Sequence, residues 1–110
     1  MKDAQTQFIQ GTLELLILRT LIYGPAHGHA IAKHIQSSSE TLRIETGSLY
    51  PALHRLEAQG FVRPEWRLSD KGKRARYYQL TPAGKRQLTA EHSRWEQFVL
   101  AMSRVLLPLE

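Results

Sequence analysis

Residues 46–60 constrain the fold of this chain more than any other stretch, because they carry the signals of a helix at both ends. Ser48 is expected to cap the N-terminus with its hydroxyl, and Pro51 to lie in the first turn, where its missing N–H costs little. Gly60 can adopt the left-handed conformation that ends a helix. Between these limits an apolar stripe recurs at helical spacing: Leu49, Leu53 and Leu56. The stretch is therefore predicted to be a helix that packs its leucines against the rest of the protein.

The opposite face of this helix lacks the charges of an ordinary solvated surface. At 100° per residue, the positions turned away from the leucines are Gly47, Pro51, His54 and Ala58. Hydrogen-bonding side chains surround them: Ser48, Tyr50 and Arg55. This face is either the solvated polar side of an amphipathic helix or a contact surface. Small residues favour the second reading, because they let another surface approach closely.

The first apolar segment, residues 12–22, is predicted to be a helix with two apolar faces. One face would hold Leu13, Leu16, Ile17 and Leu21, and the other Leu15, Leu18 and Ile22. Such a helix must be covered on both sides. In a chain of 110 residues, a second subunit is the expected cover of the second face, which places Leu15 and Leu18 in a dimer interface.

A short helix is predicted at residues 28–36, and a polar linker leads from it to the helix at residues 46–60. Its inward candidates are Ala30, Ile31, His34 and Ile35, whereas His29 and Lys33 would point elsewhere. This order matches a helix-turn-helix unit: a helix at residues 12–22, a short helix at 28–36, a linker, and the helix with a contact face at 46–60. The linker is longer than the tightest turns, which winged variants of this unit tolerate.

After Gly60 the apolar period changes to that of strands, and residues 61–68 and 75–80 are rich in aromatic and branched side chains. They predict a β-hairpin with a glycine-containing tip at residues 69–74. Pro64 argues for an edge position of the first strand, or for a strand that begins after it. Because an isolated hairpin is marginally stable, Trp66 and one of the adjacent tyrosines, Tyr77 or Tyr78, are expected to pack on the helical core.

The hairpin carries most of the chain's formal net charge of +5. Its basic residues are Arg63, Arg67, Lys71, Lys73, Arg74 and Arg76, against the acidic Glu65 and Asp70. A basic loop is more often solvated than a ligand site, but directly after a helix-turn-helix it is typical of a wing that lies along a phosphate backbone.

The last segment, residues 81–110, is predicted to be one long helix that begins at Thr81-Pro82 and ends before Pro108. Apolar residues recur every seven positions in it: Leu88, Trp95, Met102 and Leu109. Between them lie Phe98, Val99, Val105 and Leu106. This is a coiled-coil-like seam, and we expect it to join two subunits. Trp95 is either a plain seam residue or, near the dyad, a stacking surface for a small aromatic effector.

Catalytic and metal-binding motifs are missing from the sequence. There is no cysteine, no HExxH, no P-loop and no G-x-S-x-G, and His34 has no carboxylate three or four residues on. We expect no enzyme activity, no cofactor and no metal. The start of the chain lacks the features of a signal peptide, and no apolar run approaches the roughly 20 residues of a membrane span, so we expect a cytoplasmic protein without membrane contact.

Four segments resemble the PadR family of bacterial transcriptional regulators: residues 11–18, 28–31, 47–57 (GSLYPALHRLE) and 76–84 (RYYQLTPAG). The single C-terminal helix is similar to that of the short subfamily. The resemblance implies a winged-helix homodimer that binds a palindromic operator, usually represses, and is often released by a small molecule such as a phenolic acid or a planar drug.

These patterns predict a mainly α fold with a small β-hairpin, namely a winged helix-turn-helix plus a long C-terminal dimerisation helix. Residues 1–80 would form the DNA-binding domain, with an N-terminal arm at 1–10, and residues 81–110 the dimerisation helix. The expected function is a sequence-specific DNA-binding transcriptional regulator, a repressor that binds double-stranded DNA as a homodimer and is released by an aromatic effector at Trp95. The alternative is a winged-helix adaptor for protein–protein contacts, whose basic wing serves solubility.

The residues expected to contact DNA are Ser48, Tyr50, Pro51, His54, Arg55, Lys33, Lys71, Lys73, Arg74 and Arg76. The residues expected in the dimer interface are Leu15, Leu18, Leu88, Trp95, Phe98, Val99, Met102, Val105 and Leu106. Within the first set, Ser48, Tyr50 and the helix N-terminus would hold phosphates, and His54 and Arg55 would lie nearest the base edges.

Overall fold

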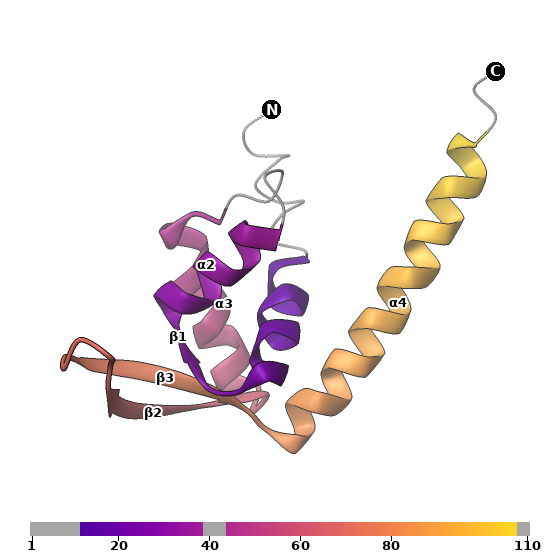
Figure 1. Cartoon of the computed structure of the whole chain (residues 1–110). Coiled ribbons are helices and arrows are strands. Elements are labelled where there is room, and N and C mark those ends of the chain that lie inside the picture. Colours follow the sequence, from indigo (N-terminus) through magenta and orange to yellow (C-terminus); the bar gives the residue numbers. More distant parts are fainter. Residues whose placement is uncertain (1–11, 39–43, 108–110) are drawn as a thin grey trace.

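The computed structural model describes residues 12–38 and 44–107 (Figure 1). A first helix at residues 12–20 continues into the short 3₁₀ helix η1 (Leu21–Tyr23), and then follow β1 (Ala26–His27), α2 (Gly28–Ser38) and α3 (Thr46–Ala58). A hairpin of β2 (Val62–Leu68) and β3 (Arg74–Leu80) leads into α4 (Pro82–Leu106). This order confirms the predicted fold class. The predicted N-terminal arm and Leu109 lie outside the described residues.

One hydrophobic core holds the first helix, α2 and α3 together, and the sheet closes it from one side. The predicted leucine stripe of α3 is confirmed, since Leu49, Leu53 and Leu56 are all buried, together with Ala52 between them. The first helix contributes Leu13, Ile17 and Leu18, and η1 contributes Leu21; α2 contributes Ile31 and Ile35. In contrast to the prediction, His34 is exposed, because the inward face of α2 is narrower than its sequence suggested.

Two residues predicted in the dimer interface belong to this core instead. The side chain of Leu18 is 1% exposed and that of Leu88 is 6% exposed within a single chain. Leu18 therefore lies among the leucines and isoleucines of its own subunit, and Leu88 attaches the start of α4 to that core. Little of either side chain is therefore left for a second subunit to contact, although Leu88 still borders the cleft between α4 and the first helix, and their place in a dimer interface stays a prediction.

The start of α3 differs from the prediction and its end agrees with it. The helix begins at Thr46, and the N–H of Ser48 donates to the Glu45 carbonyl, so Ser48 is already inside the first turn rather than its cap. Pro51 accordingly lies in the helix interior and not in the first turn. At the other end, Gly60 has φ +79°, and the N–H of Phe61 donates to the Leu56 carbonyl over 2.9 Å. This pattern is the glycine-dependent stop that the sequence predicted.

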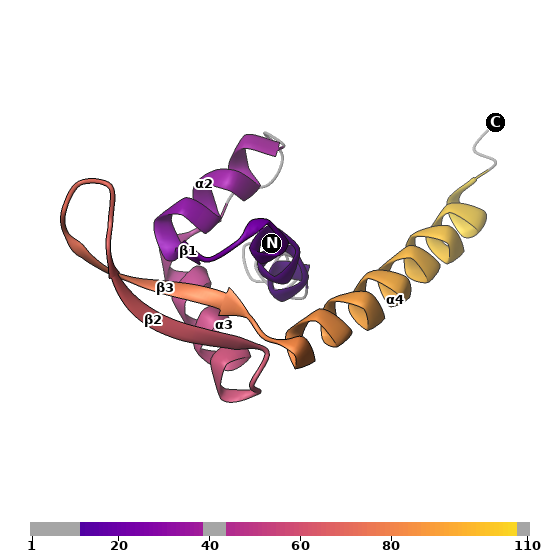
Figure 2. The same cartoon turned by 60° about the horizontal axis from the view of Figure 1, so that its bottom comes forward.

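The sheet is antiparallel, with the strand order β1-β3-β2. β2 contains Pro64 and lies at an edge, as the proline required. β1 was not predicted, because two residues are too few to show an alternating pattern; Ala26 pairs with Tyr78, and His27 with Tyr77. Tyr78 is buried as expected, whereas Trp66 is 59% exposed and does not pack on the core. The hairpin extends beyond α3 on the side opposite to α4 (Figure 2).

α4 is fixed at its first turn and then runs away from the other helices (Figure 1). The Thr81 hydroxyl accepts the N–H of Gly84 over 3.0 Å, which confirms the predicted cap. The same hydroxyl donates to the Gly60 carbonyl, and the Thr81 N–H donates to the Phe61 carbonyl. None of the described helices combines the length and the apolarity that a membrane-spanning helix requires.

Candidate nucleic-acid interface

The face of α3 that points away from the leucine stripe is open to solvent. It consists of the four residues placed there by helical spacing, which are all exposed: Gly47, Pro51, His54 and Ala58. Tyr50 and Arg55 flank it and are exposed, and Ser48 is half-buried. Lys33 of α2 is exposed as well. The structure therefore presents the α3 residues of the predicted DNA-binding set on one accessible helix surface.

Tyr50 is positioned by a close approach between α3 and the first turn of α2. A Cβ atom built on Gly28 would lie 2.9 Å from the Tyr50 hydroxyl, so only glycine leaves room for the ring in this place. The same turn is capped by His27, whose Nδ1 accepts the N–H of Ala30 over 3.1 Å. The His27 ring also contacts Tyr77 on β3. The start of α2 is thus tied to the sheet and supports the ring of Tyr50.

Arg55 forms an ion pair that joins α3 to the first helix. Its Nε lies 3.0 Å from Oε2 of Glu14 in the first helix. Both side chains remain partly exposed, so the pair contributes little stability. The pair does hold the Arg55 guanidinium toward Glu14. Because His54 is exposed on the same face, it is the polar side chain best placed to approach a ligand directly.

Arg76 does not belong to the free cations of the wing, contrary to the prediction. Its guanidinium lies 3.0 Å from the Glu57 carboxylate of α3 and also stands over the ring of Tyr78. Burial raises the pKa of the Tyr78 hydroxyl, an effect that Arg76 opposes and that Glu57 and Tyr50 reinforce. Arg76 thus connects β3 to α3 at the base of the hairpin, and we remove it from the set of residues that would contact a ligand.

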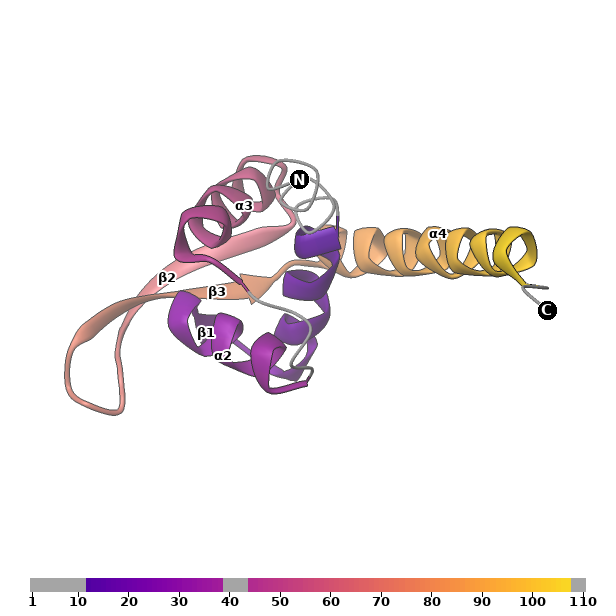
Figure 3. The ribbon, with the colours of Figure 1, turned by 90° about the horizontal axis from the view of Figure 1, so that it is seen from above.

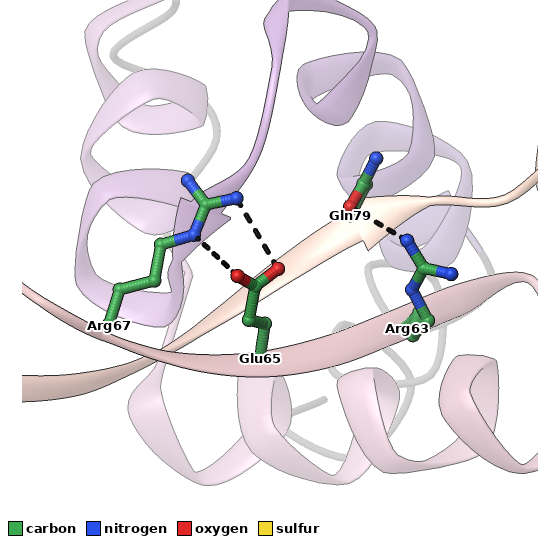
Figure 4. Close-up of polar contacts among 4 residues, drawn as sticks. All are labelled: Arg63, Glu65, Arg67 and Gln79. Atoms are coloured by element: carbon green, nitrogen blue, oxygen red, sulfur yellow. Dashed lines mark hydrogen bonds and ion pairs between the residues drawn. The ribbon is translucent and has the colours of Figure 1, made fainter.

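Two further arginines of the hairpin are held on one face of it. The Arg63 guanidinium donates to the Gln79 side chain, and Arg67 forms an ion pair with Glu65 at 3.3 Å (Figure 4). Arg67 also stands over the ring of Tyr77. Because these contacts occupy Arg63 and Arg67, the uncommitted positive charge of the hairpin is concentrated at its tip.

The tip is a tight turn that exposes three cations. The Ser69 N–H donates to the Lys73 carbonyl over 2.7 Å, and Gly72 adopts φ +77°, which favours glycine. Lys71, Lys73 and Arg74 are exposed, and none of them forms an ion pair within the part of the chain that the structure describes; the Arg74 guanidinium stands 5.1 Å from the centre of the Trp66 ring. The hairpin therefore presents these exposed cations at a tip that projects beyond the helices (Figure 3).

The second half of α4 has an apolar surface that its own chain does not cover. Its exposed apolar side chains are Phe98, Val99, Leu100, Met102, Val105, Leu106 and Leu107. A cleft of about 370 Å³ separates α4 from the first helix and is lined by Thr12, Leu15, Leu16, Arg19, Leu88, His92 and Trp95. Trp95 is half-buried at this cleft and packs on Phe98, with ring centroids 5.9 Å apart.

The family model described as "Transcriptional regulator PadR-like family" matches residues 17–90, from the first helix into α4. The chain belongs to the PadR-like family of transcriptional regulators. The resemblance seen in the sequence is thereby confirmed. Membership makes the protein a transcriptional regulator, and regulation in this family implies binding to DNA.

Relatives and solved structures agree with this assignment. Transcriptional regulator Rv3488 of Mycobacterium tuberculosis is 35% identical over 91 residues, which cover 83% of this chain and 82% of that protein. A 37.1 kDa protein in transposon TN4556 of Streptomyces fradiae is 47% identical over 78 residues, 71% of this chain but only 21% of that protein. A PadR family transcriptional regulator from Eggerthella lenta has a TM-score of 0.79 at 30% identity, covering 96% of this chain and 91% of that chain. A transcriptional regulator from Clostridium thermocellum has a TM-score of 0.82 at 29% identity, covering 91% of this chain and 98% of that chain.

Several residues that shape this PadR-family surface carried no readable signal in the sequence. Gly28 was noticed only as part of a motif, and its contact with Tyr50 joins two helices. His27 belongs to no motif of the sequence, whereas in the structure it caps α2. Within the described residues, no group of three or more histidine, aspartate or glutamate side chains is arranged to hold a metal ion.

Proposed function

We propose that this PadR-family regulator is a sequence-specific repressor that binds a palindromic operator as a homodimer. The observation that carries the proposal is the open, uncharged face of α3 together with a wing tip that exposes three cations outside any ion pair. α3 would enter the major groove, and the wing would lie against the neighbouring phosphates or minor groove. A gel shift of the protein on the DNA upstream of its own gene tests this. A retarded band at physiological salt is expected, and no band with any upstream fragment would contradict it.

Each side chain of the surface has a role that its position supports. The start of α3, with Ser48 and Tyr50, would hold a phosphate, and exposed Lys33 on α2 would hold another. Pro51 would lie against the groove wall. His54 would hydrogen-bond to a base edge, since it is the most central polar side chain on the open face.

A second copy of the chain is the cover that we propose for α4. The exposed seam residues Phe98, Met102 and Val105 would meet their counterparts, and Leu15 and Trp95 at the cleft would be covered by the partner's α4. The twofold axis would place the two α3 helices on successive major-groove faces, about 34–36 Å apart. A small aromatic effector that enters the cleft beside Trp95 would change this spacing and release the operator.

Neutralising the wing tip is expected to weaken binding to every sequence. In Lys73→Ala with Arg74→Ala, the slope of log K against log salt should become shallower by roughly 0.9 for each lost phosphate contact. Fluorescence anisotropy at several salt concentrations measures it. The matched control is Arg63→Ala with Arg67→Ala, which removes the same charge from side chains already engaged within the hairpin. Equal slopes in the two double variants would remove the wing from the interface.

Truncation of His54 is expected to relax operator choice instead. His54→Ala should cost about 1–3 kcal/mol on the preferred operator and much less on unrelated DNA, because a base contact is lost and phosphate contacts remain. Competition binding between the operator and a random duplex measures the ratio of the two affinities. His34→Ala, an exposed histidine on α2, serves as the control. If the two duplexes lose affinity equally in His54→Ala, this side chain does not read bases.

A further inference from the structure

Glu14 belongs to neither predicted residue set, yet it bonds to a residue of the α3 surface. It lies in the first helix, and its Oε2 accepts the Nε–H of Arg55 over 3.0 Å. The two residues are 41 positions apart in the chain, so the contact joins two helices. Arg55 follows His54 at the edge of the open face of α3. A residue outside this face therefore controls the position of a cation on it.

The bond to Glu14 uses only one of the three nitrogens of the Arg55 guanidinium. Glu14 accepts from Nε, and neither terminal nitrogen of Arg55 forms a hydrogen bond with another of the described residues. The Arg55 side chain is 46% exposed. The two terminal amino groups are therefore available donors on a guanidinium that is held at its Nε.

The Glu14 carboxylate depends on this bond for the compensation of its charge. Its other oxygen, Oε1, is buried and has no hydrogen-bond partner among the described residues. A buried carboxylate oxygen without a donor is costly, and the loss of Arg55 would leave both oxygens of Glu14 unpaired. Arg55 is thus favoured to keep its Nε on Glu14 and to meet any ligand with its terminal nitrogens.

We propose that Glu14 is a positioning residue for DNA recognition, which holds Arg55 so that its two terminal amino groups donate to one guanine in the major groove. Guanine presents two acceptors there, O6 and N7, which match a bidentate guanidinium. A phosphate at an arbitrary position must instead draw the guanidinium off Glu14, whose negative charge also reduces the attraction. Glu14 therefore lowers the affinity for unrelated DNA more than the affinity for the operator. This inference rests on the proposed function, since it requires that α3 binds duplex DNA.

Glu14→Gln tests the proposal, because it removes the charge and leaves an acceptor of the same shape. The probes are a random-sequence duplex and the duplex that the wild type enriches from a random pool, and anisotropy at several salt concentrations measures binding. We expect the variant to bind the random duplex more tightly, with a salt slope steeper by roughly 0.9, because Arg55 becomes free to hold one phosphate. The ratio of the two affinities should fall roughly tenfold, within the range that one bidentate guanine contact supplies.

Glu96→Gln is the matched control for the change in net charge. It removes one negative charge from α4, where the Glu96 side chain is 70% exposed and pairs only with His92 within the described residues. Both variants have the same formal net charge, so a slope and a ratio that stay at the wild-type values in Glu96→Gln assign the effect to the position of Glu14.

Arg55→Ala shows whether Glu14 acts through Arg55. In this background Glu14→Gln should change neither the salt slope nor the ratio of affinities, because the side chain that Glu14 positions is gone. Sequences selected by Arg55→Ala from the random pool should lose a guanine from each half-site. Thermal unfolding of each variant verifies folding.

The outcomes distinguish this inference from the proposed function. If Glu14→Gln keeps the wild-type slope and ratio, if it changes them equally in the Arg55→Ala background, or if Arg55→Ala selects the same guanines, the role of Glu14 is overturned and DNA binding stands. If the wild type enriches no sequence and does not bind the random duplex, both proposals are overturned together.

Discussion

Gly84→Ala is expected to lower the free energy of unfolding by about 3 kcal/mol, at the upper end of what overpacking usually costs. A Cβ atom on Gly84 would overlap the carbonyl oxygen of Phe61 and would lie 2.9 Å from Cδ1 of Leu80. The Phe61 carbonyl cannot move away freely, because it accepts the Thr81 N–H and follows the turn that ends α3. Urea denaturation followed by circular dichroism measures the change.

Gly47→Ala is the matched control for this substitution. No other group lies within 4 Å of a Cβ atom built on Gly47, which is on the exposed face of α3. Replacing a helical glycine by alanine without a clash should stabilise the protein by roughly 0.5–1 kcal/mol. If Gly84→Ala unfolds at the same urea concentration as Gly47→Ala, the joint between the wing and α4 is not as tightly packed as described.

Phe98→Glu with Val105→Glu is expected to separate the dimer and to reduce operator affinity by a factor of about 10² to 10⁴, the range over which two linked binding modules exceed one. In the single chain Val105 is 81% exposed and Phe98 is 51% exposed, so the subunit itself should keep its fold. In a dimer the same positions would bury unpaired carboxylates against an apolar seam, which is strongly unfavourable. Sedimentation velocity and anisotropy on the operator measure the two effects.

The control adds the same number of carboxylates to polar positions of the same helix. Gln97→Glu with Ser103→Glu changes exposed residues off the predicted seam and should leave both the dimer and the operator affinity nearly unchanged. A dimer that survives Phe98→Glu with Val105→Glu would show that the two subunits meet through some other surface.

The order of the helices and the hairpin could be predicted from the sequence because their signals are local. The leucine spacing of α3 and its stop at Gly60 depend on residues within a few turns of each other. The start of α3 was missed because it is set by a tertiary contact. The Gln36 side chain donates to the carbonyl of buried Ile44, which fixes the chain just before Thr46, two residues ahead of the expected cap.

The candidate site was harder to predict, because its details depend on pairs that are distant in the sequence. Arg76 and Glu57 are separated by 19 residues, and nothing in either segment indicates their ion pair. Periodicity identified Leu18 and Leu88 as apolar, but it cannot tell whether such a residue is covered by its own chain or by a second one. Trp66 was expected on the core because an isolated hairpin is only marginally stable, yet its side chain is 59% exposed.

Selection of bound sequences from a random pool of duplex DNA tests the central claim most directly. Two copies of α3 related by a twofold axis predict an enriched inverted repeat, whose half-sites are centred one helical turn, about 10–10.5 base pairs, apart. Enrichment of a single unpaired half-site, or of no sequence at all, would contradict the account of a dimeric regulator that reads DNA with α3.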